Sequence, residues 1–172
     1  MKVNTNDKSK QWYLLYTTPR AEKKVFIELT KHGFEVFLPL QKKLRIWSDR
    51  KKWIDTPLFN SYIFVNTNLS FYYELLNITG IVKFVALEKV PVVVRQSDIE
   101  LIQLMIANYE EIEATPKKLE SGSKVQIIAG PLRGQIGELV EYKQKKSVMI
   151  DIQTIGYSLF VQLPDNIIRA FK

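Results

Sequence analysis

Cysteine is absent from the 172 residues, and histidine occurs once, as His32. A chain without cysteine has no disulfide, no thiolate metal site and no cysteine nucleophile. A single histidine cannot build a histidine-based metal site alone. Aspartate and glutamate are present, but no paired acidic motif indicates acid–base chemistry. We therefore expect a protein that acts by binding, without metal or cofactor, rather than an enzyme.

Long apolar runs are also lacking. No stretch approaches the roughly 18 apolar residues that a membrane-spanning helix requires. The N-terminal sequence MKVNTNDKSKQ is polar and has no apolar segment of the kind found in signal peptides. The simplest expectation is a cytoplasmic monomer that does not contact a membrane.

Basic residues exceed acidic ones. Lysine and arginine total 25 and aspartate and glutamate total 18, which gives a net charge of +7. This excess favours nucleic acid or an acidic surface as a partner, although lysines scattered over the surface would give the same total.

Apolar runs of strand length alternate with short helical segments over residues 11–112, after a leader over residues 1–10 that we expect to be disordered. This alternation predicts an α+β fold in which helices pack on a mixed sheet. The expected strands are Trp12–Thr17, Phe34–Pro39, Pro57–Asn66, Val82–Ala86 and Val90–Val94, and helices are expected over residues 70–77 and from Ser97.

The first helix of this domain has the plainest signals. Thr18 is a good N-cap and Pro19 a good first helical residue, so we expect the helix to begin there. Ala21, Val25 and Leu29 then recur every four residues and place one apolar stripe on it.

A basic hairpin is predicted in the middle of the same domain. Leu44–Trp47 and Lys52–Asp55 are short runs that flank the polar sequence SDRK. Tryptophans are interleaved with basic residues here, a mixture that suits phosphate contact combined with stacking. A charged arm that is merely solvated is the alternative.

The pattern changes after residue 112. Residues 113–121 have little apolar content and read as a flexible linker. Over residues 122–172 there is no helical periodicity. Five short strands are expected instead, with the sequences KVQII, IGELVEY, SVMIDIQ, SLFVQL and IIRAF. Five strands in about fifty residues fit a small β-barrel, which removes exposed sheet edges.

The sequence GPLRGQIG, Gly130–Gly137, could in principle cradle a phosphate. It lacks the Lys-Ser/Thr of a Walker A loop, and a strand rather than a helix follows it. A turn is therefore the better interpretation. Pro131 sets φ for the turn, and Gly130, Gly134 and Gly137 relieve tight or left-handed positions.

This segment also carries a family resemblance. KVQIIAGPLRGQIGELVEY resembles the KOW motif, a strand followed by Gly-Pro-x-x-Gly-x-x-Gly and a second strand. Upstream, WYLLYTTPRAEKKV, PLFNSYIFV and ITGIVKFVALEKVPVVV are similar, in order, to segments of the NusG N-terminal (NGN) domain. Together they resemble the NusG family of transcription factors over about residues 11–172.

Two departures from the common family pattern indicate a specialised RfaH/UpxY-like paralogue. Asn60 and Ser61 replace the usual Pro-Gly of the central segment, and WSDRKKWIDTPLF is similar to the antiterminators of polysaccharide operons.

The resemblance implies an apolar pocket on the NGN domain that binds the clamp helices of the largest RNA polymerase subunit. The positions that match are Tyr16, Phe59, Tyr62, Phe64 and Phe84. Aromatic residues in strands are more often core than interface. In LFNSYIFV, however, alternation places Tyr62 and Phe64 on one face and Ile63 and Val65 on the other. Both faces are apolar, so one remains as a candidate interaction surface.

The resemblance also implies contacts with non-template or upstream DNA. The candidate residues for this role are Arg20, Lys23, Lys24, Arg45, Arg50, Lys51, Lys52, Tyr72 and Tyr73. On the KOW module the loop QTIGYS would present Ile155 to a small-subunit ribosomal protein or to Rho. An ordinary hairpin turn is the alternative for that loop.

The function implied is that of a bacterial transcription elongation factor that binds the RNA polymerase clamp and suppresses pausing and termination, in an operon-specific role at surface polysaccharide genes. Two alternatives stay open. One is the housekeeping NusG, and the other is a KOW-containing RNA- or ribosome-binding protein.

Overall fold

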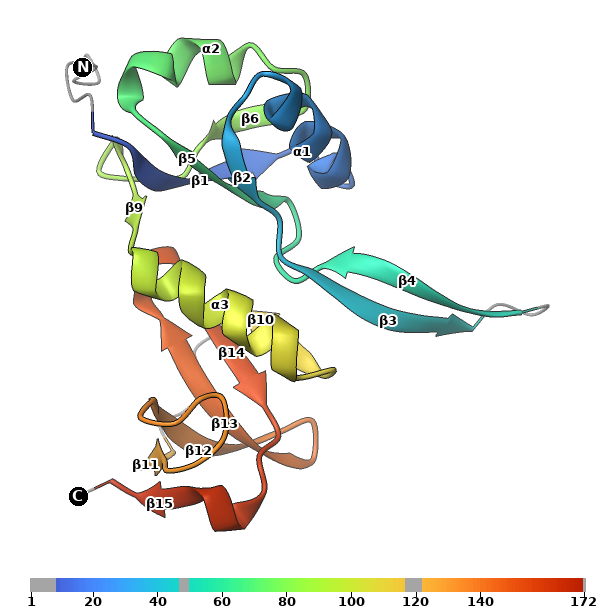
Figure 1. Ribbon diagram of the computed structural model, residues 1–172, viewed down its shortest axis with the longest axis vertical. Coiled ribbons are helices and arrows are strands. Elements are labelled where there is room, and N and C mark those ends of the chain that lie inside the picture. Colours follow the sequence, from blue (N-terminus) through green and yellow to red (C-terminus); the bar gives the residue numbers. More distant parts are fainter. Residues whose placement is uncertain (1–8, 47–49, 117–121, 172) are drawn as a thin grey trace. The chain divides into compact units, whose positions relative to one another are not determined.

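The computed structural model describes residues 9–46, 50–116 and 122–171 (Figure 1). The chain divides into two compact units, residues 1–40 with 59–99, and residues 41–58 with 100–172. Most of the predicted leader, residues 1–8, lies outside the described residues.

The first unit contains an antiparallel sheet with strand order β2-β5-β1-β6. A short fifth strand, β9, also pairs with β1. The strands are β1 (Gln11–Thr17), β2 (Glu35–Phe37), β5 (Tyr62–Thr67), β6 (Ile81–Phe84) and β9 (Val93–Val94). Because β1 lies between β5 and β6, its side chains have neighbours on both sides, which makes it the centre of the sheet (Figure 1).

Two helices, α1 (Glu22–Lys31) and α2 (Tyr72–Leu76), cover one face of this sheet, with the short 3₁₀ helix η1 (Leu69–Phe71) before α2 (Figure 1). The apolar stripe of α1 is confirmed, since Val25 and Leu29 are fully buried in the core between α1 and the sheet. The predicted helix start was wrong. Arg20 has φ +66°, a left-handed conformation that interrupts a helix, so α1 begins after it, with Ala21 as N-cap.

The chain leaves this sheet through a small hairpin and a long helix. β7 (Ala86–Leu87) and β8 (Val90–Pro91) form the hairpin, and α3 (Gln96–Asn108) follows β9. The indole Nε1 of Trp12 donates a 2.8 Å hydrogen bond to Oε1 of Gln96, which fastens the start of α3 to β1. α3 begins at Gln96, close to the expected position, and spans the division between the two units.

The predicted basic hairpin is confirmed as β3 (Leu40–Ile46) and β4 (Lys51–Pro57), which pair with each other. The Thr56 hydroxyl donates to the Gln41 carbonyl oxygen across the hairpin at 3.3 Å. The strand expected over residues 57–66 is divided, because β4 ends at Pro57 and β5 begins at Tyr62. Ser61 has φ +64°, which turns the chain between the two strands.

The C-terminal sheet contains all five predicted strands. They are β11 (Ser123–Ile127), β12 (Ile136–Tyr142), β13 (Lys145–Ile152), β14 (Tyr157–Val161) and β15 (Ile168–Ala170), with 3₁₀ turns η2 (Gln153–Ile155) and η3 (Asp165–Ile167) between the later ones.

A sixth strand corrects the predicted linker and strand number. β10 (Ile112–Thr115) pairs antiparallel with β14, so the order is β10-β14-β13-β12-β11-β15. Ile112 is 1% exposed, and the Glu113 carboxylate accepts hydrogen bonds from Lys143 and Tyr142. One buried isoleucine and one bridging carboxylate therefore order a segment whose composition predicts a linker. Residues 117–121 of that linker lie outside the described residues.

The glycine motif forms the turn between β11 and β12, as predicted. Gly130 and Gly134 have φ +80° and +92°, and the Gly134 amide donates to the Ile127 carbonyl oxygen at 2.7 Å. Gly137 is required for a different reason, the close approach of β13. A Cβ at this position would lie 2.7 Å from the Met149 carbonyl oxygen. β12 follows the turn, so the motif closes a hairpin.

Candidate functional site

The two faces of β5 differ as alternation predicts. Ile63 and Val65 lie in the core beneath α1 and α2. Tyr62 and Phe64 therefore project from the opposite face of the sheet. Both faces carry apolar side chains. The face with Ile63 and Val65 packs against α1 and α2, and the face with Tyr62 and Phe64 is turned away from these two helices.

Buried phenylalanines form the base of this opposite face. The Phe64 ring is 5.9 Å from the Phe59 ring and 5.7 Å from the Phe37 ring, measured between centroids. Phe59 and Phe64 are 1% and 0% exposed. This burial does not fit the predicted role of the two phenylalanines as direct polymerase contacts.

Tyr16 and Tyr62 are the accessible aromatic residues of the predicted pocket. They are direct partners across β1 and β5, and their rings meet edge-to-face with centroids 5.4 Å apart. Both are half-buried. An edge-to-face tyrosine pair fixed on two paired strands is a rigid surface that is partly apolar and carries hydroxyl groups.

Phe84 does not belong with the other four predicted pocket residues. It pairs with Leu15, lies in the core beneath α1 and α2, and is 4% exposed. Its ring stacks on Tyr72 at 4.7 Å between centroids. The prediction that Phe84 shares the binding surface is wrong, because its position in β6 points it to the other face of the sheet.

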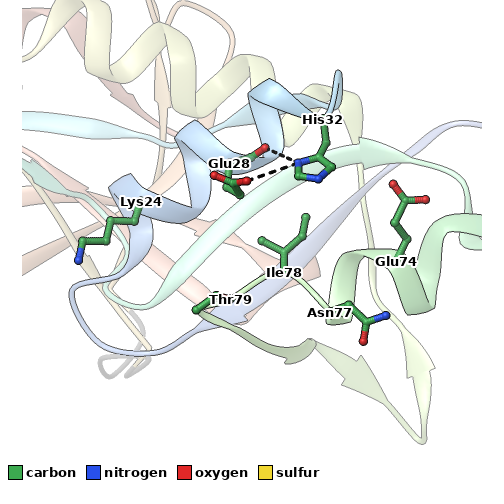
Figure 2. Close-up of a pocket in the computed structure, with 7 residues that line it drawn as sticks. All are labelled: Lys24, Glu28, His32, Glu74, Asn77, Ile78 and Thr79. Carbon is green, nitrogen blue, oxygen red and sulfur yellow. Dashed lines mark hydrogen bonds and ion pairs between the residues drawn. The ribbon is translucent and has the colours of Figure 1, made fainter.

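The predicted DNA-binding residues Arg20, Lys23 and Lys24 are exposed at the start of α1. Lys24 lines a groove of about 540 Å³ together with Glu28, His32, Glu74, Asn77, Ile78 and Thr79 (Figure 2). Nδ1 of His32 is 2.9 Å from the Glu28 carbonyl oxygen. With Glu28 on α1 and Glu74 on α2, the groove carries two carboxylates and is poorly suited to a phosphate.

The two tyrosines predicted to stack on DNA have different surroundings. Tyr72 packs against the core and stacks on Phe84, so one face of its ring is covered, and the rest of the side chain is half-buried. Tyr73 is 64% exposed. Tyr73 is therefore the more accessible of the two, and the DNA contact of both stays a prediction.

The basic hairpin is largely exposed. Arg45, Arg50, Lys51 and Lys52 are exposed on β3, on β4 and just before β4. Three apolar side chains are exposed among them: Leu44, Ile46 and Trp53, at 44%, 69% and 61%. Trp47 lies outside the described residues. The β3–β4 hairpin thus exposes both charged and apolar side chains.

Ile155 lies in η2, in the connection between β13 and β14 where the sequence places it. Its side chain is half-buried rather than exposed, which corrects the expected exposure. Gly156 follows with φ +67° and closes the turn.

Sequence reasoning missed two residues around this surface. Lys83 on β6 is the cross-strand neighbour of Tyr16 on β1, and the Glu22 carboxylate accepts a hydrogen bond from the buried Ser61 amide. Both contacts join distant segments, and no local pattern marks Lys83 or Glu22.

Within residues 9–46, 50–116 and 122–171, no three histidine, aspartate or glutamate side chains come together as a metal site would require. In the same part of the chain, every helix is too short or too polar to cross a membrane.

The chain thus combines an antiparallel sheet that two helices cover on one face with a second, all-β sheet. A solved structure titled "Domain interaction in Thermotoga maritima NusG" shares this fold with a TM-score of 0.61 and 24% identity, over 95% of this chain and 98% of that one.

The sequence itself shows the family of this chain. The protein-family model described as "Transcription termination factor nusG" matches residues 10–103, more than half of the chain. The "Transcription termination/antitermination protein NusG" of Rickettsia typhi is 21% identical over 172 residues, covering 93% of this chain and 90% of the relative. The NusG of Rickettsia prowazekii is also 21% identical. The chain belongs to the NusG family, whose members are transcription factors and not enzymes.

Proposed function

We propose that this protein binds RNA polymerase through the face of its first sheet that carries Tyr16 and Tyr62, and that it thereby suppresses pausing and termination. The observation that carries this proposal is the accessible tyrosine pair on the sheet face that also carries the buried Phe64. Interface hot spots are enriched in tyrosine held in well-packed surroundings. No catalytic group is required, since a factor that binds one polymerase conformation preferentially stabilises it by that difference in affinity.

The polymerase element proposed as the partner is the pair of clamp helices of the largest subunit, which the family resemblance implies. Residues 11–112 would supply this contact, and the KOW module over residues 122–172 would act separately on a small-subunit ribosomal protein or Rho. Exposed Arg45, Lys51 and Lys52 support a further contact with non-template or upstream DNA, because each phosphate favours a nearby cation.

A specialised, operon-specific role at surface polysaccharide genes is part of the proposal. Its support is the departure from Pro-Gly at Asn60 and Ser61. Ser61 adopts φ +64°, a conformation that suits glycine better, and Glu22 holds it by a hydrogen bond to its amide. At this position, where the family usually has glycine, the chain therefore has a serine in a left-handed conformation whose amide is bonded to Glu22.

The test measures binding of the full chain to RNA polymerase core enzyme from the same organism. Tyr62→Ala is expected to weaken binding about tenfold or more, because truncating an interface tyrosine at the centre of a contact has effects of that size. Tyr73→Ala is the matched control, since this tyrosine is exposed on α2, which lies on the other face of the sheet. Equal binding by wild type and Tyr62→Ala would contradict the proposed surface.

Run-off transcription across a terminator tests the direction of the effect. Wild-type protein is expected to increase read-through, and Tyr62→Ala to lose most of that increase. A rise in termination caused by wild-type protein would overturn the antitermination part and favour the housekeeping alternative.

A further inference from the structure

Three side chains form a continuous row across the central strands of the first sheet. Tyr62 on β5 is the direct partner of Tyr16 on β1, and Tyr16 is the direct partner of Lys83 on β6. Residues directly opposite each other in a sheet project from the same face. Phe84 follows Lys83 and lies in the core beneath α1 and α2, so Lys83 projects from the other face, beside the tyrosines.

The row combines two aromatic rings with one cation. Nζ of Lys83 lies over the Tyr16 ring, 5.8 Å from its centroid, within the range of a cation–π interaction. Lys83 is exposed, and within the described part of the chain no carboxylate forms an ion pair with it. Its charge is therefore held in a defined place by an aromatic neighbour and is available to an external group.

We propose that Lys83 is a specificity-determining contact of this surface, which binds a protein segment carrying a carboxylate beside an apolar side chain. The apolar side chain packs on the Tyr16–Tyr62 pair, and the carboxylate pairs with the Lys83 ammonium. This inference rests on the proposed function, and it adds the chemistry that the polymerase element must present. Complementary charges at an interface fix register and exclude wrong partners.

A protein partner fits the geometry better than a nucleic acid does. Base stacking requires an open aromatic face. The Lys83 ammonium lies over the Tyr16 ring, and the Tyr62 ring meets Tyr16 at an interplanar angle of 66°. Neither arrangement leaves a flat platform, whereas an aliphatic side chain can fill the angle between the two rings.

The experiment measures the affinity of the full chain for RNA polymerase core enzyme, free of nucleic acid, with Lys83→Met and Lys83→Glu. Methionine keeps an unbranched side chain and removes the charge, so we expect about threefold weaker binding. Lys83→Glu places a carboxylate beside the carboxylate of the partner, so we expect about tenfold weaker binding. The Kd of Lys83→Met should also rise less steeply with salt than that of wild type.

Lys89→Glu is the matched control. Lys89 is exposed in the turn between β7 and β8, belongs to the same unit, and gives the same change in net charge. We expect its affinity to equal that of wild type. Thermal unfolding of all variants confirms that each is folded.

The outcomes separate this inference from the proposed function. If Tyr62→Ala weakens binding and both Lys83 variants bind as wild type does, the role of Lys83 is overturned and the proposed function stands. If Tyr62→Ala binds as wild type does, or wild type does not bind, both are overturned. If the Lys83 variants lose affinity only for a labelled single-stranded DNA, the surface binds nucleic acid and the inference is wrong.

Discussion

The backbone amide of Ser61 donates a 2.7 Å hydrogen bond to Oε1 of Glu22, and both residues are buried. This bond joins the turn before β5 to the first turn of α1. Ser61 also holds the strand end through its carbonyl oxygen, which accepts from the Thr17 amide at 2.8 Å. One short turn thus fixes β1, α1 and β5 at the end of the sheet where Tyr16 and Tyr62 meet.

Replacing Glu22 with alanine should lower the free energy of unfolding by about 2 kcal/mol. The Ser61 amide would lose a charged acceptor inside the protein, where an unsatisfied donor is costly. The measurement is urea denaturation of the full chain. Glu22→Gln is the control, because its amide oxygen can still accept the bond, and we expect it to lose less than half as much. Equal losses would show that the hydrogen bond is not the cause.

Replacing Ser61 with glycine should raise the free energy of unfolding by about 0.5 kcal/mol. A left-handed conformation costs a non-glycine residue about 1–2 kcal/mol, and part of the gain is lost to the greater freedom of glycine in the unfolded chain. Ser61→Ala keeps the left-handed strain, so it should show no gain. Differential thermal unfolding of the three proteins decides this, and a lower midpoint for Ser61→Gly would contradict it.

Gly130 and Gly137 should respond differently to substitution, although they belong to one motif. Gly137→Ala should destabilise by about 1–3 kcal/mol, because the new Cβ would lie 2.6 Å from Val148 Cγ1 and 2.7 Å from the Met149 carbonyl oxygen. Gly130→Asn should cost less than about 1 kcal/mol, because the space is open and asparagine tolerates a positive φ. Denaturant titration of both variants provides the comparison. A larger loss for Gly130→Asn would refute this division.

The attachment of β10 should weaken in acid. Burial raises the pKa of Glu113, but the hydrogen bond and charge of Lys143 and the Tyr142 hydroxyl outweigh it, and the net pKa lies below the usual value. A lowered folded pKa means that the stabilisation is present above the unfolded pKa, near 4.5, and is lost as pH falls through the folded pKa.

Hydrogen exchange of the β10 amides at pH 6 and at pH 3 measures this effect. Glu113 is 38% exposed, so the contribution should stay below about 1 kcal/mol. The variant Glu113→Gln should show weaker protection at pH 6 and a smaller change on acidification. An unchanged pH dependence in this variant would argue against the role of Glu113.

Local chemistry let the sequence predict most strands and the outline of the site. The alternation in PLFNSYIFV correctly separated Tyr62 and Phe64 from Ile63 and Val65, because side chains in a strand point to opposite faces. The glycines of GPLRGQIG correctly predicted a turn between two strands.

The errors arose where distant segments meet. β10 was read as linker because its order depends on β14 and on Lys143, about thirty residues away. Phe84 was grouped with Phe64 because both match aromatic positions of the family motifs. Only the register of β6 against β1 shows that Phe84 points beneath the helices.

By itself, the sequence determined the absence of cysteine chemistry, the positions of most strands, the glycine turn and the family motifs, all of which follow from residue type and short-range periodicity. The tertiary structure decided which aromatic rings are buried and which are accessible, and that Lys83 stands beside Tyr16 and Tyr62. The physical reason is that β6 and β5 pair with β1 from distant parts of the chain. Which side chains become neighbours depends on this long-range pairing, and short-range periodicity does not describe it.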